Sequence, residues 1–344
     1  MRTPALVIFA VLTAATAWAQ HAPLDRLSRG QLDVMPPSQR VSGVPGQMTV
    51  RQTSCRTLPD VNLRRRIVDI AVQEWAFFGF TVVDQAQPFT PNPRPRGARR
   101  GFRWLNPDES ARVASSIAGY WTVTASGGWI LGNQNEAWKG PDGIASRWRD
   151  PWSAAFVSWV MCEAGLGDAG RFARAVAHHV YIDQAIRARG NSTDEAAYVA
   201  YDVGEVSIEP GDLLCSARRP GYQTIADRQR QMGDGARTHC DVVVGIDRSA
   251  SRLLAIGGNV RGAVSLKLLP VTPPAAGAGT SSASPVGEPR GMFVHLKLRA
   301  AAIEADALRT SPTIEALGCA VGFTAPAQLV ATNLTPAALR SNRC

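Results

Sequence analysis

The stretch that decides the fold is Arg149–Gly165, RDPWSAAFVSWVMCEAG, where an apolar run directly follows a Pro-Trp pair. The run has the length and composition of a buried helix, from about Ala154 to Ala164, and Gly165 is a residue type that ends helices. Ser153 is then expected at the helix N-terminus, where unpaired backbone N–H groups and a partial positive charge gather. Such a terminus lowers the pKa of a thiol and can stabilise an oxyanion.

Around this helix the chain changes from helical to strand patterns at about residue 205. Apolar residues recur at helical spacing from Pro59 to Phe78, again after Asn106, and in a third helix after Asp168 that carries Phe172 and Ile186. The expected strands are Asp212–Cys215, His239–Ile246, Leu253–Gly258, Val264–Leu269 and Met292–Leu298. Helices followed by antiparallel strands predict an α+β domain.

The N-terminus has the pattern of a secretory signal, residues 1–19, with Arg2, a short apolar run and Ala17-Trp18-Ala19 as the cleavage site. An uncleaved anchor is the alternative. The apolar run is too short to span a bilayer, and no later segment is long enough. We therefore expect a periplasmic or secreted protein. Residues 20–56 are predicted to be a poorly ordered leader, 57–300 the domain and 301–344 a tail.

Composition limits the partners that the chain can have. The formal charge of +9 favours anionic cell-wall polymer or a membrane surface, or serves solubility alone. No motif supports nucleic-acid binding. Six cysteines suit an oxidising compartment, and the lack of a CxxC pair gives no support to a zinc site, so we expect no metal and no cofactor. The predicted disulfides are Cys215–Cys240, across two antiparallel strands, and Cys319–Cys344 in the tail.

Three motifs in a fixed order point to nucleophilic catalysis. They are PWSAAFVSWV with Ser153, the pair EPGDLLC and THCDVVVGID with His239, and AIGGNVRGAVSL with Asn259. A histidine on a strand beside the helix terminus can act as a base, and a polar residue on the next strand can orient its imidazole. Asp241 lies two residues after His239 and therefore on the same side of the strand, where it can supply charge or simply face solvent.

At these residues the chain resembles the NlpC-type and CHAP cell-wall hydrolases, whose helix typically reads W-C-A-A-F-V and whose fold is papain-like. The motifs PWSAAFVSWVM, AHHVYIDQA, PGDLLC, HCDVVV and GGNV, over roughly residues 59–300, resemble the bacterial domain-of-unknown-function family 2272 more closely. The resemblance implies that Ser153 stands at the nucleophile position, His239 at the base and Asn259 at the third polar position. It also implies a sheet that starts at the turn with Asp212, which is a candidate binding residue. The departure is serine in place of cysteine.

The closer family's motif adds His178, and Tyr181 one turn further on, as candidate binding residues. Trp152 is either part of the core or a platform for a sugar ring. His179 is expected to be a packed or hydrogen-bonded core histidine.

Each candidate also has an interpretation without chemistry. Ser153 is among the best N-cap residues, so it can serve only as a cap. His239 can be a histidine at a strand edge, and Asn259 can be a turn residue after two glycines.

These observations predict an exported papain-like domain, with helices packed on an antiparallel sheet, that acts on or binds peptidoglycan. As an enzyme it would be an amidase or peptidase in which Ser153 attacks an amide and His239 transfers the proton. Asn259 or Asp241 would orient the imidazole, and backbone N–H groups near Ala154 would stabilise the oxyanion. The alternatives are a non-catalytic module that binds a muropeptide or a protein, and a structural envelope protein.

Overall fold

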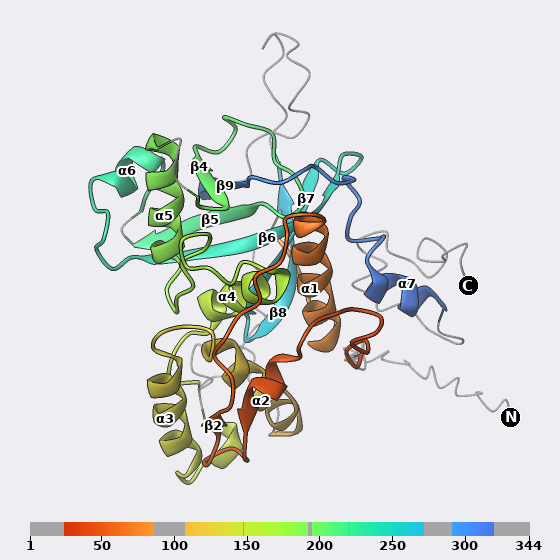
Figure 1. The fold of residues 1–344 in the computed structure, drawn as a ribbon, viewed down its shortest axis with the longest axis vertical. Helices are drawn as coiled ribbons and strands as arrows, with labels where there is room; N and C mark the ends of the chain where they lie inside the picture. Colours follow the sequence, from red (N-terminus) through yellow and green to blue (C-terminus); the bar gives the residue numbers. More distant parts are fainter. Residues whose placement is uncertain are drawn as a thin grey trace, which may run out of the picture.

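The computed structural model describes residues 24–85, 107–146, 148–191, 195–219, 221–271 and 291–319. A seven-stranded sheet with the order β3-β8-β7-β6-β5-β9-β4 is packed by helices, which gives an α+β fold (Figure 1). The strands of this sheet are β3 (Val82–Asp84), β4 (Tyr198–Tyr201), β5 (Leu213–Arg219), β6 (Arg237–Asp247), β7 (Arg252–Val260), β8 (Ala263–Pro270) and β9 (Met292–Leu298). The helices are α1 (Leu63–Phe77), α2 (Pro107–Trp121), α3 (Gly127–Trp138), α4 (Ser153–Ala164), α5 (His179–Gly190), α6 (Ile225–Gln229) and α7 (Pro312–Cys319).

The sheet is mixed, which corrects the expectation of an antiparallel sheet. The five expected strands are present and pair antiparallel with one another, but β3 at one edge pairs parallel with β8. The other edge is β4, which pairs antiparallel with β9. Both edge strands were missed because three or four residues are too few to show an alternating pattern.

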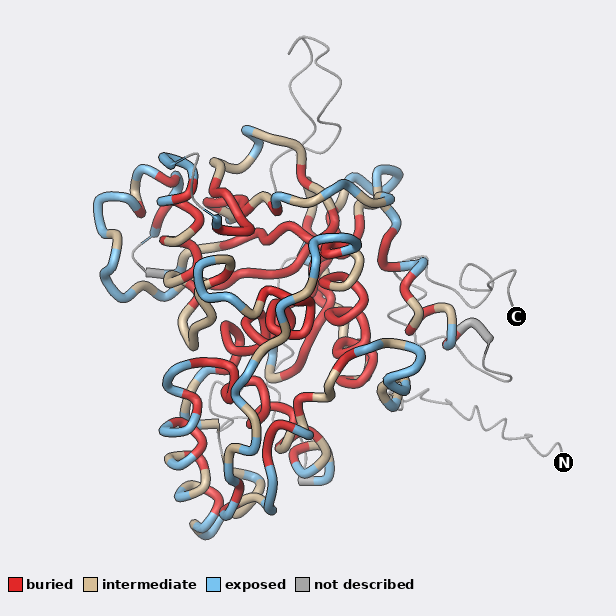
Figure 2. The backbone as a smooth tube through the Cα atoms, in the orientation of Figure 1, coloured by how far each residue is buried: buried red, intermediate tan, exposed pale blue. Residues whose placement is uncertain are grey.

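Helix α4 lies in the middle of the molecule, and all of its residues are buried, as the continuous red tube in Figure 2 shows. It packs against β6 and β7 on one side and against α1 and α2 on the other. The expected end at Gly165 is confirmed: this residue caps the helix with a φ of 107°, a conformation that favours glycine. The stretch that decides the fold is therefore its central helix.

The helix expected after Asp168 begins only at His179, so that prediction was wrong by about ten residues. The Asp168 carboxylate instead accepts a hydrogen bond from the Gly170 N–H at 2.6 Å, which closes a turn. The chain then runs without regular structure to His178. This irregular approach is what positions the start of α5 beside β6.

Residues 24–56 are ordered, which corrects the expectation of a poorly ordered leader. They include a short 3-10 helix, η1 (Pro37–Arg40), and a small antiparallel pair, β1 (Val41–Ser42) and β2 (Thr49–Val50). Figure 1 shows this red-to-orange segment running past α4 to the start of α1. Val34 joins the main core cluster, and Val41 and Met48 pack against residues of α2 and α3. These buried apolar residues are few and widely spaced, and ionic and covalent contacts hold the rest of the segment, so a periodic apolar pattern was the wrong criterion.

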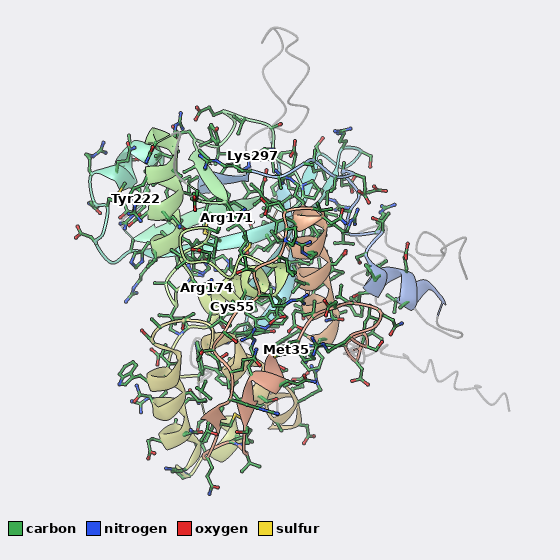
Figure 3. All side chains as sticks on the ribbon, viewed as in Figure 1. Met35, Cys55, Arg171, Arg174, Tyr222 and Lys297 are labelled. Atoms are coloured by element: carbon green, nitrogen blue, oxygen red, sulfur yellow. A yellow bond between two sulfur atoms is a disulfide. The ribbon has the colours of Figure 1, made fainter. Side chains whose placement is uncertain are left out.

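Two disulfides hold the described chain. Cys215–Cys240 joins β5 to β6 at directly opposite positions, as predicted. Cys55–Cys162 joins the N-terminal segment to the last turn of α4; Figure 3 labels Cys55 where this segment passes the helix. The predicted Cys319–Cys344 pair depends on Cys344, which lies outside the described residues.

The first part of the expected tail is joined to the domain. Ala307, Leu308, Ile314 and Leu317 belong to the main core cluster, and α7 packs against α1. In the part of the chain that the structure describes, no helix combines the length and apolar character needed to cross a membrane.

Candidate functional site

The site is built around the first residue of α4. Trp152 is the N-cap residue, and its fully buried ring stacks on Phe78 and Tyr120 with centroid distances of 5.7 and 5.9 Å. Trp152 is therefore a core residue in this fold and not an exposed sugar platform. This stacking fixes the Trp152 ring and thereby the position of the next residue, Ser153. The Ser153 hydroxyl is not used as a helix cap.

Ser153 Oγ instead lies 2.9 Å from Nδ1 of His239. The packing of α4 against β6 brings the two residues together across 86 positions of sequence. On β6 the residue after His239 is Cys240, whose disulfide to β5 fixes the strand at this point. Ser153 and His239 keep 7% and 8% of their surface exposed, so the pair is almost buried.

The other ring nitrogen of His239 is held by a carboxylate. Nε2 lies 2.8 Å from Oδ1 of Asp241, and Oδ2 of Asp241 accepts a hydrogen bond from Lys267 Nζ at 2.7 Å. Asp241 is completely buried and Lys267 is 7% exposed. The result is a continuous row of serine hydroxyl, imidazole, carboxylate and ammonium.

A glycine makes room for this row. The antiparallel register pairs Val242 with Ile256, so Gly257 lies opposite Asp241. A Cβ atom at Gly257 would lie 2.0 Å from Asp241 Oδ1 and 3.0 Å from His239 Nε2. The first glycine of the AIGGNV motif is therefore required by the His–Asp contact, and not only by a turn before Asn259.

A second imidazole contacts the same serine. Nε2 of His178 lies 2.9 Å from Ser153 Oγ. Nδ1 of His178 accepts a hydrogen bond from the Cys240 backbone N–H at 3.2 Å and also forms a hydrogen bond with the Tyr181 hydroxyl. His178 is the residue just before α5, so the late start of that helix places its ring over Ser153.

The electrostatics of the site favour neutral histidines beside an ionised carboxylate. Burial lowers the pKa of His239 below its ordinary 6.5, and Asp241 only partly offsets this. Burial also holds the pKa of His178 well below 6.5, and charge on His239 would lower it further. For Asp241, burial alone would raise the pKa, but His239 and Lys267 bring it well below the ordinary 3.8.

These charges determine the proton positions along the row. The Asp241 carboxylate can only accept, so Nε2 of the neutral His239 ring carries the hydrogen and Nδ1 is a bare acceptor. The Ser153 hydroxyl can then donate to Nδ1. The arrangement is that of a base ready to take the serine proton, although the two ring nitrogens are used in the opposite sense from the usual serine triad.

The remaining predicted residues lie elsewhere. Asn259 sits half-buried at an irregularity of β7 with a φ of 57°, and the imidazole of His239 is held by Asp241 instead. Asp212 belongs to a separate buried cluster with His295, at 2.8 Å, and Arg64, at 2.6 Å. His179 is only partly buried, and its Nδ1 accepts from the Ala236 N–H at 3.4 Å.

Lys267 was not predicted as a site residue. It stands in the apolar stretch AVSLKLLP of β8, and a single lysine that is buried in such a strand needs an anionic partner. That signal was present in the sequence. Its partner could not be named without the strand order, because β7 separates β8 from β6.

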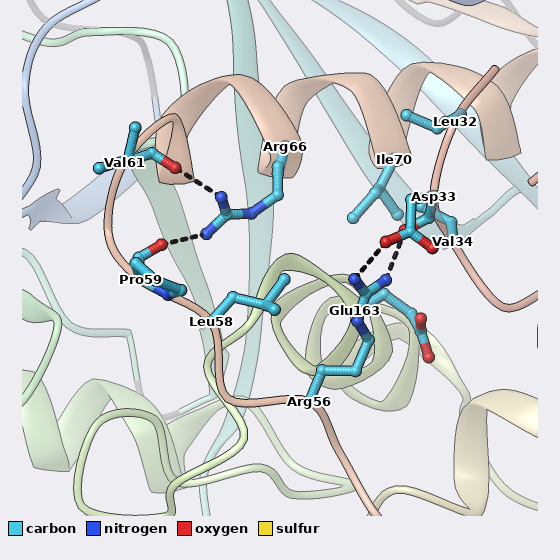
Figure 4. A pocket seen from close by; sticks show the side chains of 10 residues that line it. All are labelled: Leu32, Asp33, Val34, Arg56, Leu58, Pro59, Val61, Arg66, Ile70 and Glu163. Carbon is cyan, nitrogen blue, oxygen red and sulfur yellow. Dashed lines mark hydrogen bonds and ion pairs between the residues drawn. The ribbon is translucent and has the colours of Figure 1, made fainter. Parts of the chain in front are cut away.

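A surface pocket of about 380 Å³ lies at the opposite end of α4 (Figure 4). Its lining includes Glu163, Ile70 and Leu58, and two arginines that are already engaged: Arg56 with Asp33, and Arg66 with the carbonyl oxygens of Val61 and Pro59. Ser153 is at the first residue of α4 and Glu163 near its last, so this pocket is separate from the serine site.

Residues 101–297 match the model of the family described as "Uncharacterized protein conserved in bacteria (DUF2272)". The match includes Ser153, His178, His239, Asp241 and Lys267. It begins after α1, so the resemblance expected from residue 59 is supported only from residue 101. Comparison with curated proteins gives no match, and neither does comparison with solved structures.

Proposed function

We propose that this chain, which belongs to the bacterial DUF2272 family, is an exported amide hydrolase that acts on peptidoglycan with Ser153 as its nucleophile. One observation carries the proposal: Ser153 Oγ lies at a helix N-terminus, 2.9 Å from an imidazole whose other nitrogen is held by a buried carboxylate. A serine that served only as a cap would bond the N–H groups of its own helix.

The reaction follows from the proton positions. His239 Nδ1 takes the hydroxyl proton while Ser153 Oγ forms a bond to the amide carbon. The oxygen of the tetrahedral intermediate lies near the free N–H groups of the first turn, around Ala154. His239 then gives its proton to the amide nitrogen, and the C–N bond breaks. His239 then takes a proton from a water molecule, whose oxygen forms a bond to the ester carbon. The bond between that carbon and Ser153 Oγ breaks, and His239 gives the proton back to Oγ.

Asp241 supplies the negative charge that a serine needs when it stands at a position where cysteine is usual. A serine hydroxyl is far less acidic than a thiol, so the imidazolium that forms during attack must be stabilised by charge. An asparagine cannot supply that charge, whereas the ionised Asp241 can, and Lys267 keeps it ionised. The site thus has the carboxylate that a serine nucleophile requires.

The papain-like architecture is part of the same proposal. A nucleophile at the N-terminus of a buried central helix and a base on a neighbouring antiparallel strand are the arrangement that the resemblance to NlpC-type and CHAP hydrolases implies. The substrate class rests on that resemblance, on the signal-like N-terminus and on the charge of +9, which suits an anionic polymer. The two disulfides agree with a location outside the cytoplasm.

The direct test is digestion of purified peptidoglycan, followed by mass spectrometry of the released fragments and by assay of new amino groups. Wild type should release fragments, and Ser153→Ala should not. Ser158→Ala is the matched control, because Ser158 is buried in the same helix and its hydroxyl bonds only the backbone of Ala175. Fragments from Ser153→Ala would refute the assignment of the nucleophile. Binding without fragments from wild type would favour a non-catalytic module.

Hydrolysis should reach its plateau at neutral pH and fall only in acid, below the ordinary histidine range near pH 6.5. The base must be neutral, and burial lowers the pKa of His239, so protonation requires a lower pH than usual. The measurement is kcat/KM against pH. Circular dichroism at each pH is the control, because a lowered histidine pKa in the folded state also costs stability as pH falls. If activity is already lost as pH is lowered from 8 to 7, the assignment of His239 as the base is contradicted.

A further inference from the structure

Ser153 has one imidazole more than a serine–histidine–aspartate site needs. His178 Nε2 lies 2.9 Å from Ser153 Oγ, the same distance as His239 Nδ1 on the other side. The two rings are tilted against each other with centroids 5.1 Å apart. Because both histidines cannot take the same hydroxyl proton, they must have different roles.

The partners of His178 decide which nitrogen carries its hydrogen. Its Nδ1 accepts from the Cys240 backbone N–H at 3.2 Å, and a nitrogen that accepts from a backbone N–H cannot itself be protonated. The Tyr181 hydroxyl bonds the same nitrogen. Burial raises the pKa of Tyr181 well above 10, so this hydroxyl keeps its hydrogen and acts as a donor. The hydrogen of His178 is therefore on Nε2, facing Ser153 Oγ.

We propose that His178 is a catalytic residue that acts as a fixed N–H donor to Ser153 Oγ, and that Tyr181 is the positioning residue that holds it in this tautomer. As His239 takes the hydroxyl proton, negative charge develops on Oγ, and the Nε2–H bond from His178 strengthens with it. His178 keeps its own hydrogen throughout. The same bond stabilises Oγ again when the ester is hydrolysed and the serine leaves.

The proposal rests on the proposed nucleophile, and it explains why a serine can work at this position. A thiol with a pKa near 8.5 is readily ionised by a helix terminus and one histidine. A serine hydroxyl is not, so it gains much more from a second polar group on its oxygen. The contribution of His178 should therefore be large for serine and small for cysteine at position 153.

The test measures nucleophile reactivity and does not depend on the natural substrate. Ser153 is labelled with a fluorophosphonate and Ser153→Cys with iodoacetamide, and each rate is followed by intact mass. His178→Leu should slow labelling of the serine about 100-fold, the usual effect of losing one such donor. His178→Gln, which can still donate an N–H, should recover part of this loss. In Ser153→Cys, His178→Leu should change the alkylation rate less than tenfold.

Two controls keep the outcomes separate. Long-range ¹H–¹⁵N NMR of the unaltered protein should show His178 protonated at Nε2 and bare at Nδ1, and Tyr181→Phe should weaken that preference. Protonation at Nδ1, equal losses in the serine and cysteine backgrounds, or full labelling of His178→Leu would each overturn the role of His178 and leave the proposed function standing. A wild-type protein that labels no faster than Ser153→Ala would overturn both.

Discussion

Asp241→Asn should lower the rate of amide hydrolysis by about four orders of magnitude with little change in the fold. The carboxylate holds the hydrogen of His239 on Nε2 and leaves Nδ1 free to accept from Ser153. Lys267 Nζ can only donate, so the oxygen of the new amide must face Lys267 and its NH2 group must face His239. The imidazole would then carry its hydrogen on Nδ1, where it blocks the transfer from Ser153.

The chain offers a matched control for this substitution. Asp212 is also completely buried, with a histidine, His295, at 2.8 Å and a cation, Arg64, at 2.6 Å, yet it is not joined to Ser153. Asp212→Asn should lose stability to a similar degree but keep its rate per folded molecule. Rates on peptidoglycan and thermal melts of both variants separate the two effects. An Asp241→Asn protein that hydrolyses within tenfold of wild type would show that no imidazolium forms on the reaction path.

The contact between His239 and Asp241 could be predicted from the sequence, whereas the contact between Lys267 and Asp241 could not. Residues two apart on a strand share a side, so Asp241 was a predictable partner for His239. The spacing could not decide between Asp241 and Asn259, because that choice depends on how β7 curves at its glycines. Lys267 reaches Asp241 from a strand that is not its neighbour, and only the sheet order reveals that contact.

His178 shows a different limit. Its motif came from a family resemblance, and helical periodicity placed it inside a helix that was expected to start near Asp168. In the structure the irregular segment continues to His178, and the His178 ring contacts Ser153 and Cys240. Periodicity reports which residues face a core, but it does not locate a helix start where neither a cap nor a proline marks one.

The N-terminal segment was misjudged because its buried apolar residues are few and widely spaced, and because two of its contacts with the core are ion pairs. Arg26 pairs with Glu74 at 2.5 and 2.8 Å, and Arg40 pairs with Glu163; both glutamates are completely buried. The segment also contributes Cys55 to a disulfide. Since the segment shows little apolar periodicity, its sequence alone resembles that of a disordered leader. Its partners lie on α1 and α4, far along the chain.

Deletion of residues 20–55 should therefore abolish cooperative folding. Glu74 and Glu163 would be left as buried carboxylates without their arginines, and removing one partner of a buried pair typically costs about 3–5 kcal/mol. Two such losses approach the whole stability of a typical domain, about 5–15 kcal/mol, and the loss of the Cys55–Cys162 bridge adds to them. A chain that begins at Arg56 should show no sharp thermal transition by circular dichroism, whereas one that begins at Gln20 should.

A graded series identifies the cause of this loss. Arg40→Ala should destabilise the chain that begins at Gln20 strongly, whereas Arg29→Ala should change its melting temperature little. Arg29 is the matched control because its contact with Asp33, at 3.6 Å, is solvent-exposed. Replacing Arg40 and Glu163 together by methionine should recover much of the loss, since no buried charge is then left unpaired. If the chain from Arg56 melts within a few degrees of the chain from Gln20, the segment contributes nothing that the domain needs, and the buried ion pairs do not stabilise it.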